Sequence, residues 1–197
     1  MLTIQNHSDT ALFVLHEIYG INRHMEHVCK TLSNHGFDVF CPNLLNRDQP
    51  FDYCEEEAAY QHFVHQVGFE AAARKVRSVI DSSRSRYRRV FIIGYSVGAT
   101  IAWLLSGETL LCSGVVCYYG SRIRDYLEIQ PITPVLLFLP QQEKSFDVGQ
   151  LLAKLRDKEN VTPHQLPGLH GCSDPFSPHY NQDAYRQSFE KMLLFLN

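Results

Sequence analysis

A serine flanked by two glycines is the residue of this chain best suited to nucleophilic chemistry. Gly94-Tyr95-Ser96-Val97-Gly98 follows the apolar run 90–93 and precedes a helical pattern over 99–105. In a G-x-S-x-G motif between a buried strand and a helix, a strained turn exposes the serine hydroxyl. The glycines suit such a turn, since a Cβ at either position would clash. An ordinary tight turn is the alternative, and we predict that Ser96 is a nucleophile.

The base that would activate Ser96 is predicted to be His170. A hydroxyl is a weak nucleophile until a base takes its proton. In sheets of this kind the chain order is serine, acid and then histidine, each after a strand. His170 follows the last predicted strand in a glycine-flanked loop, whereas His164 falls within that strand and His179 lies in a proline-rich loop.

The acid that would orient His170 is predicted from the loop after the strand expected at 134–139. Glu143 lies four residues beyond that strand, within reach of an imidazole. Asp147 is the alternative acid, although its side chain can instead cap the next helix by accepting hydrogen bonds from the first turn. We predict Glu143 and retain Asp147 as the alternative.

Two backbone N–H groups are predicted to stabilise the oxyanion that forms when a serine attacks a carbonyl. One is the N–H of Val97, directly after the nucleophile, and the other comes from a loop after an earlier strand. That loop is 16–22 in this chain, and the N–H of Ile18 is the predicted second donor.

Apolar strand-like runs alternate with helical stretches along the whole chain. Strands are expected over 11–15, 37–41, 90–95, 114–119, 134–139 and 161–166. Further helices are expected from an Asn22 cap through Asn34, from 55 to about 84 with a break near Gly68, over 145–158 and over 183–196. Strands rich in Val, Ile, Leu and Phe favour a mostly parallel sheet with helices on both faces. We therefore predict one α/β domain spanning residues 1–197.

Composition excludes several classes of partner. Eighteen basic and 21 acidic residues give a net charge of −3, so no nucleic-acid partner is implied. We interpret the basic cluster at 84–89 as a solvent-exposed connector between a helix and a strand. There is neither a G-x-G-x-x-G motif nor a P-loop, and no cofactor is predicted. The apolar stretch 11–15 is too short for a signal peptide or a membrane span, so no membrane association is expected.

The cysteines and histidines give weaker signals. Six cysteines are scattered without a framework spacing, which indicates reduced thiols and a cytoplasmic location. His24 and His27, like His62 and His65, have a spacing that can bind a metal on one helix face. No carboxylate or third ligand accompanies either pair at a fitting offset, so no metal site is predicted. Nothing in the sequence indicates the oligomeric state.

The chain resembles the dienelactone hydrolase family, a compact branch of the α/β-hydrolase fold. The resemblance covers nearly the whole chain and rests on His16 to Asn22 (His-Glu-Ile-Tyr-Gly-Ile-Asn), the 94–98 motif, 118–120 (Tyr-Tyr-Gly) and His170. It implies Ser96 as nucleophile, His170 as base, and Ile18 and Val97 as oxyanion donors. It also places Glu143 where the family has its triad aspartate, and Glu17 where the family has a glutamate that contacts the nucleophile.

Two departures from the family pattern bear on the substrate. The type enzymes of the family use a cysteine in the motif that here holds Ser96, so the role of Glu17 is open between a structural hydrogen-bond acceptor and a group that tunes the site. They also hold the substrate carboxylate with arginines, where this chain has Asp174 and the acidic stretch 54–57. We expect repulsion of an anionic dienelactone.

These observations predict a serine hydrolase that cleaves small carboxylic esters or lactones through an acyl-enzyme. The small-molecule substrate is the only partner implied. Two alternatives stay open: a hydrolase-fold protein that binds a ligand with little or no turnover, and an acyl transferase or peptidase that uses the same triad.

Overall fold

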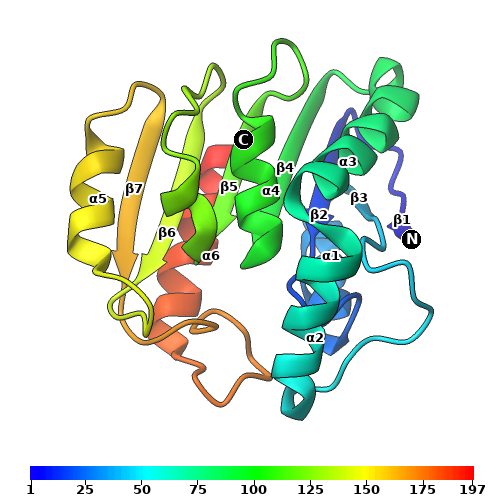
Figure 1. Ribbon diagram of the computed structural model, residues 1–197. Helices are drawn as coiled ribbons and strands as arrows, with labels where there is room; N and C mark the ends of the chain where they lie inside the picture. Colours follow the sequence, from blue (N-terminus) through cyan, green and yellow to red (C-terminus); the bar gives the residue numbers. More distant parts are fainter.

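A seven-stranded sheet forms the centre of the protein (Figure 1). The computed structural model describes all residues, 1–197. The strand order is β1-β3-β2-β4-β5-β6-β7, and all neighbouring pairs are parallel except β1 with β3. The strands are β1 (Leu2–Ile4), β2 (Thr10–Leu15), β3 (Asp38–Cys41), β4 (Arg89–Tyr95), β5 (Gly114–Tyr118), β6 (Val135–Pro140) and β7 (Val161–Leu166).

Six α-helices surround this sheet, and five of them cover its two faces. They are α1 (Arg23–Asn34), α2 (Glu56–His62), α3 (Phe69–Ser83), α4 (Val97–Leu105), α5 (Val148–Arg156) and α6 (Gln182–Leu196). In Figure 1, α3, α4 and α5 lie in front of the sheet, and α1 and α6 lie behind it. Two buried clusters match these layers, one joining the sheet to α3, α4 and α5 and the other joining it to α1 and α6. The predicted parallel α/β architecture is confirmed.

Local sequence signals explain most of the element boundaries. Asn22 caps α1 by accepting a hydrogen bond from the backbone of Met25, and the chain leaves that helix through Gly36 with φ of 86°. The break predicted near Gly68 is also present, because this glycine has φ of 74° and separates a π-helical turn at Phe63–Val67 from α3. The antiparallel edge strand β1 was not expected, since three residues carry too little pattern to predict a strand.

The carboxyl ends of the parallel strands meet at one edge of the sheet, the lower edge in Figure 1. Loops that follow β2, β4, β6 and β7 therefore lie close together, although they come from distant parts of the chain. This edge is where ligands bind in open α/β sheets. None of the helices is both long and apolar enough to cross a membrane.

Candidate active site

Ser96 occupies the sharp turn between β4 and α4. Its φ of 53° and ψ of −114° are strained for a residue with a side chain, and its N–H donates to Tyr118 O at 2.9 Å. The turn brings backbone segments close together at two positions, and both positions are occupied by glycine, which has no Cβ. A Cβ on Gly94 would lie 2.2 Å from Gly98 O, and one on Gly98 would lie 2.3 Å from Leu15 O. Both glycines of the motif are thus required sterically.

The steric requirement at Gly98 predicts a large loss of stability on substitution. We expect Gly98→Ala to lower the free energy of unfolding by roughly 3 kcal/mol, because the rigid β2 backbone must move to admit the methyl group. Gly36→Ala is the control. Gly36, unlike Gly98, has a positive φ, but a Cβ there meets nothing within 4 Å, so we expect only the backbone strain of about 1–2 kcal/mol. Equal urea midpoints for the two variants would contradict the close approach.

The structure brings Ser96, His170 and Glu143 together in a hydrogen-bonded chain. Glu143 Oε1 lies 2.7 Å from His170 Nδ1, and Ser96 Oγ lies 3.0 Å from His170 Nε2. Because a carboxylate can only accept hydrogen bonds, His170 Nδ1 carries the proton, and Nε2 is free to accept a hydrogen bond from the Ser96 hydroxyl. Asp147, the alternative acid, instead caps α5 by accepting from the backbone N–H of Gln150.

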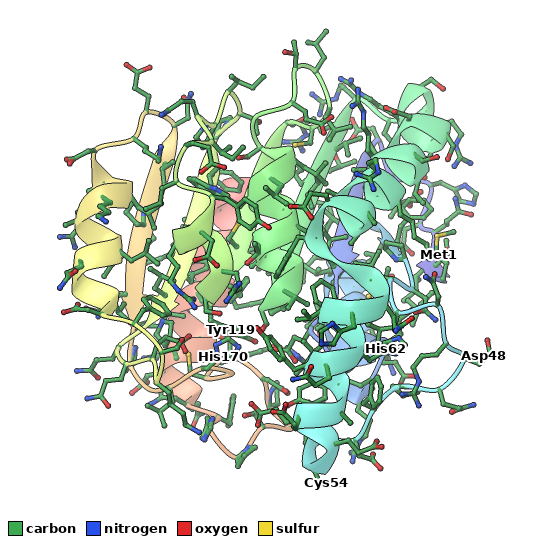
Figure 2. The ribbon with its side chains drawn as sticks, in the orientation of Figure 1. Met1, Asp48, Cys54, His62, Tyr119 and His170 are labelled. Atoms are coloured by element: carbon green, nitrogen blue, oxygen red, sulfur yellow. The ribbon has the colours of Figure 1, made fainter.

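His170 is held in place by its surroundings. Its ring packs against Tyr119, with the ring centroids 4.9 Å apart, and Figure 2 shows the two side chains next to each other at the lower edge of the sheet. Burial alone would lower the pKa of His170, but the hydrogen bond and the charge of Glu143 outweigh burial and raise this pKa above its usual value.

The predicted oxyanion donors face the same cavity as Ser96. Val97 is the first residue of α4, where the helix offers its N–H no acceptor, and the Ile18 N–H donates to no protein group. His16 fixes the peptide that carries the Ile18 N–H, since its Nδ1–H donates to Glu17 O at 2.6 Å. The other His16 nitrogen accepts from Leu44 N at 2.9 Å, and burial lowers the pKa of this imidazole to about 4, so the ring is neutral.

A cavity of about 520 Å³ opens beside Ser96 and His170. Tyr19, Tyr53 and Tyr60 contribute aromatic surface to its lining. The acidic residues Glu17, Glu56 and Asp174 also line it, as does Arg122, whose charge is paired with Asp125 at 2.8 Å. The lining is therefore rich in carboxylates, in agreement with the acidic stretches seen in the sequence.

Glu17, His24 and Asp174 form a buried group beside the cavity. His24 Nδ1 lies 3.5 Å from Glu17 Oε2 and 3.6 Å from Asp174 Oδ2. Burial alone would raise the pKa of Glu17, but the neighbouring His24 outweighs it and lowers this pKa, whereas burial and the nearby Glu17 charge raise the pKa of Asp174.

Sequence reasoning missed this group because its members come from separate parts of the chain. The spacing of His24 and His27 suggested a pair on one helix, but His27 instead lies 3.4 Å from the Tyr185 hydroxyl. The two carboxylates near His24 come from the loops after β2 and β7. Tyr53, which donates a hydrogen bond to Asp174, extends the group toward the cavity.

Comparison with known proteins identifies the family of this chain and agrees with its fold. Residues 2–197 match the family model described as the dienelactone hydrolase family. YczH, an uncharacterized protein of Bacillus subtilis (strain 168), is 42% identical over 176 residues, which cover 88% of this chain and 86% of YczH.

Solved structures show the same fold at low sequence identity. A Klebsiella pneumoniae protein provisionally named a dienelactone hydrolase superposes with a TM-score of 0.77 at 19% identity, covering 94% of this chain and 85% of that one. A dienelactone hydrolase-like promiscuous phosphotriesterase from metagenomic libraries gives a TM-score of 0.74 at 18% identity, covering 95% and 85%. With a family match over almost every residue, this chain belongs to the dienelactone hydrolase family.

Proposed function

We propose that this protein is a serine hydrolase that cleaves small carboxylic esters or lactones through an acyl-enzyme. The observation that carries the proposal is the hydrogen-bonded chain from Ser96 through His170 to Glu143 at the wall of a cavity. Membership of a hydrolase family supports the reaction class.

Acylation begins when Ser96 Oγ attacks the carbonyl carbon of the substrate. His170 Nε2, 3.0 Å from Oγ, takes the hydroxyl proton, and Glu143 holds the imidazole in the productive tautomer and stabilises its positive charge. The N–H groups of Ile18 and Val97 donate to the oxyanion of the tetrahedral intermediate. His170 then protonates the leaving alkoxide, and the acyl group remains on Ser96.

Deacylation repeats these steps with water as the nucleophile. His170 takes a proton from the water as the water oxygen attacks the acyl carbon, and it then gives this proton to Ser96 Oγ as the product leaves as a carboxylic acid, which ionises in solvent. The cavity is open to solvent on one side, because His170 and Glu56 at its wall are partly or fully exposed, so water reaches the ester bond.

The charges of the cavity favour neutral substrates over anionic ones. Glu17, Glu56 and Asp174 contribute carboxylates to the lining, while Arg122 is paired with Asp125 and Lys144 is solvent-exposed. A substrate carboxylate would therefore meet repulsion and lose hydration without gaining a strong ion pair.

We expect the purified protein to hydrolyse neutral p-nitrophenyl acetate and p-nitrophenyl butyrate. The anionic mono-p-nitrophenyl succinate, similar in length to the butyrate, should have a kcat/KM at least about tenfold lower, a difference of 1.4 kcal/mol in transition-state binding. Release of p-nitrophenol measures all three rates in one assay.

A fluorophosphonate probe is the control that separates catalysis from ligand binding. Only an activated serine reacts with this probe, so labelling of one serine per chain supports the hydrolase. A folded protein that neither reacts with the probe nor hydrolyses any of the three esters would instead be a hydrolase-fold binding protein, and the proposed function would be wrong.

A further inference from the structure

Three side chains that can ligate a metal ion meet beside the nucleophile turn. Glu17, His24 and Asp174 come from the loop after β2, the first turn of α1 and the loop after β7. They are 5%, 0% and 1% exposed, and their ligand atoms all lie within 4.8 Å of one another. Such burial distinguishes them from surface carboxylates, which gather without a ligand.

The His24 imidazole has no hydrogen-bond partner on either nitrogen, although it is fully buried. Buried polar groups nearly always have partners, and an exception calls for an explanation. Nδ1 lies 3.5 Å and 3.6 Å from the two carboxylate oxygens, beyond the 2.7–3.2 Å of an N–H···O bond. One proton on Nδ1 can also serve only one of two oxygens that are nearly equidistant.

A divalent cation accounts for these distances better than a proton does. A tetrahedral ion with ligands about 2.1 Å away holds neighbouring ligand atoms about 3.4 Å apart, close to the two observed separations. Such an ion would also neutralise both buried carboxylates, whose charges otherwise lie close together in a region of low dielectric.

The groups around the three side chains also fit a metal centre. Tyr53 donates a hydrogen bond to Asp174 Oδ2, and the backbone N–H of Phe176 donates to Oδ1 at 2.8 Å, so the carboxylate is held in one orientation. Contacts of this kind are typical of metal ligands. Glu17 and Asp174 also line the cavity, which gives an ion a route from solvent and leaves a coordination position for water.

We infer that Glu17, His24 and Asp174 form a binding site for one divalent transition-metal ion of the zinc type. One imidazole and two carboxylates suit Zn²⁺, and Co²⁺ occupies such sites with the same geometry. The inference does not depend on the proposed hydrolase function, because it concerns the binding of an ion.

The test is metal binding by the tag-free, full-length protein after dialysis against a chelator. Calorimetric titration with Zn²⁺ should show one equivalent bound per chain, and Co²⁺ should give the visible absorption of a low-coordinate site. Asp174→Asn and His24→Asn should each weaken Zn²⁺ binding at least about tenfold, since each removes a ligand. Asp174→Asn keeps the shape of the side chain and its bond to Phe176, so it tests the site even if His24→Asn fails to fold.

His27→Asn is the matched control, because His27 lies three residues further along α1 and takes no part in the group. Unchanged binding by this variant, together with weakened binding by Asp174→Asn and His24→Asn, would place the ion at the buried group and exclude His27 as a ligand. The inference is overturned if the wild type binds no stoichiometric Zn²⁺, or if Asp174→Asn binds it as the wild type does. Zn²⁺ binding by a protein that hydrolyses no ester would refute the proposed function and leave the metal site standing.

Discussion

Ser96→Ala is expected to reduce kcat/KM for p-nitrophenyl acetate by at least about 10³-fold. The substitution removes the only oxygen that lies 3.0 Å from His170 Nε2, so the imidazole has no hydroxyl to deprotonate. Because the oxyanion donors and the cavity remain, a residual rate above that of the uncatalysed reaction should persist.

The stability of Ser96→Ala serves as the control for this loss. Ser96 already adopts a positive φ in the native turn, and alanine keeps a Cβ, so the melting temperature should stay close to that of the wild type. Fluorophosphonate labelling should disappear with activity. A variant that retains the wild-type rate would show that Ser96 is not the nucleophile.

Glu143→Gln is expected to lower kcat by roughly 10²–10⁴-fold with little change in KM. The amide can occupy the same place, but it can donate to Nδ1 and thereby stabilise the wrong tautomer of His170. It also removes the charge that stabilises the imidazolium. Steady-state kinetics on p-nitrophenyl butyrate, compared with Asp147→Asn, measures the effect.

Asp147→Asn tests the alternative acid. The Asp147 side chain accepts a hydrogen bond from the backbone N–H of Gln150 at the start of α5. Asparagine is also a good helix cap, so the stability and the turnover of this variant should both stay near those of the wild type. If Asp147→Asn loses as much turnover as Glu143→Gln, the assignment of Glu143 as the acid is wrong.

The pH profile gives a second measure of the Glu143–His170 pair. The base must be neutral to accept the Ser96 proton, so kcat/KM should rise with pH through the pKa of His170, which Glu143 raises above its usual value of 6.5. Without the charge of Glu143, burial lowers this pKa and the midpoint of the residual activity moves to lower pH. A midpoint that does not move would contradict the direct pairing.

Most of the sheet was predictable because its central strands carry their own apolar runs. Runs such as 90–93 and 134–139 are bounded by turn signals, whereas β7 was predicted at the residues that form it although half of them are polar. The same local logic located the helix break at Gly68. It failed for β1, whose three residues are held by pairing with β3 and not by a pattern of their own.

The site was less predictable where its parts come from separate loops. Ser96 and His170 stand out through the residues next to them, but spacing alone could not decide between Glu143 and Asp147. The contact of Asp174 with His24 depends on how the loops after β2 and β7 meet, and no short-range pattern encodes it. His16 lies in the motif that carries the family resemblance, but its hydrogen bonds to Glu17 and Leu44, and hence its role, were not predicted.

The separation of Ser96 and His170 by 74 residues has a consequence for protein synthesis. A ribosome makes the Ser96 hydroxyl well before the His170 imidazole, and β7 must pair with β6 at the edge of the sheet before the two side chains can meet. Under the proposed function, a growing chain therefore carries the serine without its base, and we expect no ester hydrolysis until the loop after β7 has been made and placed.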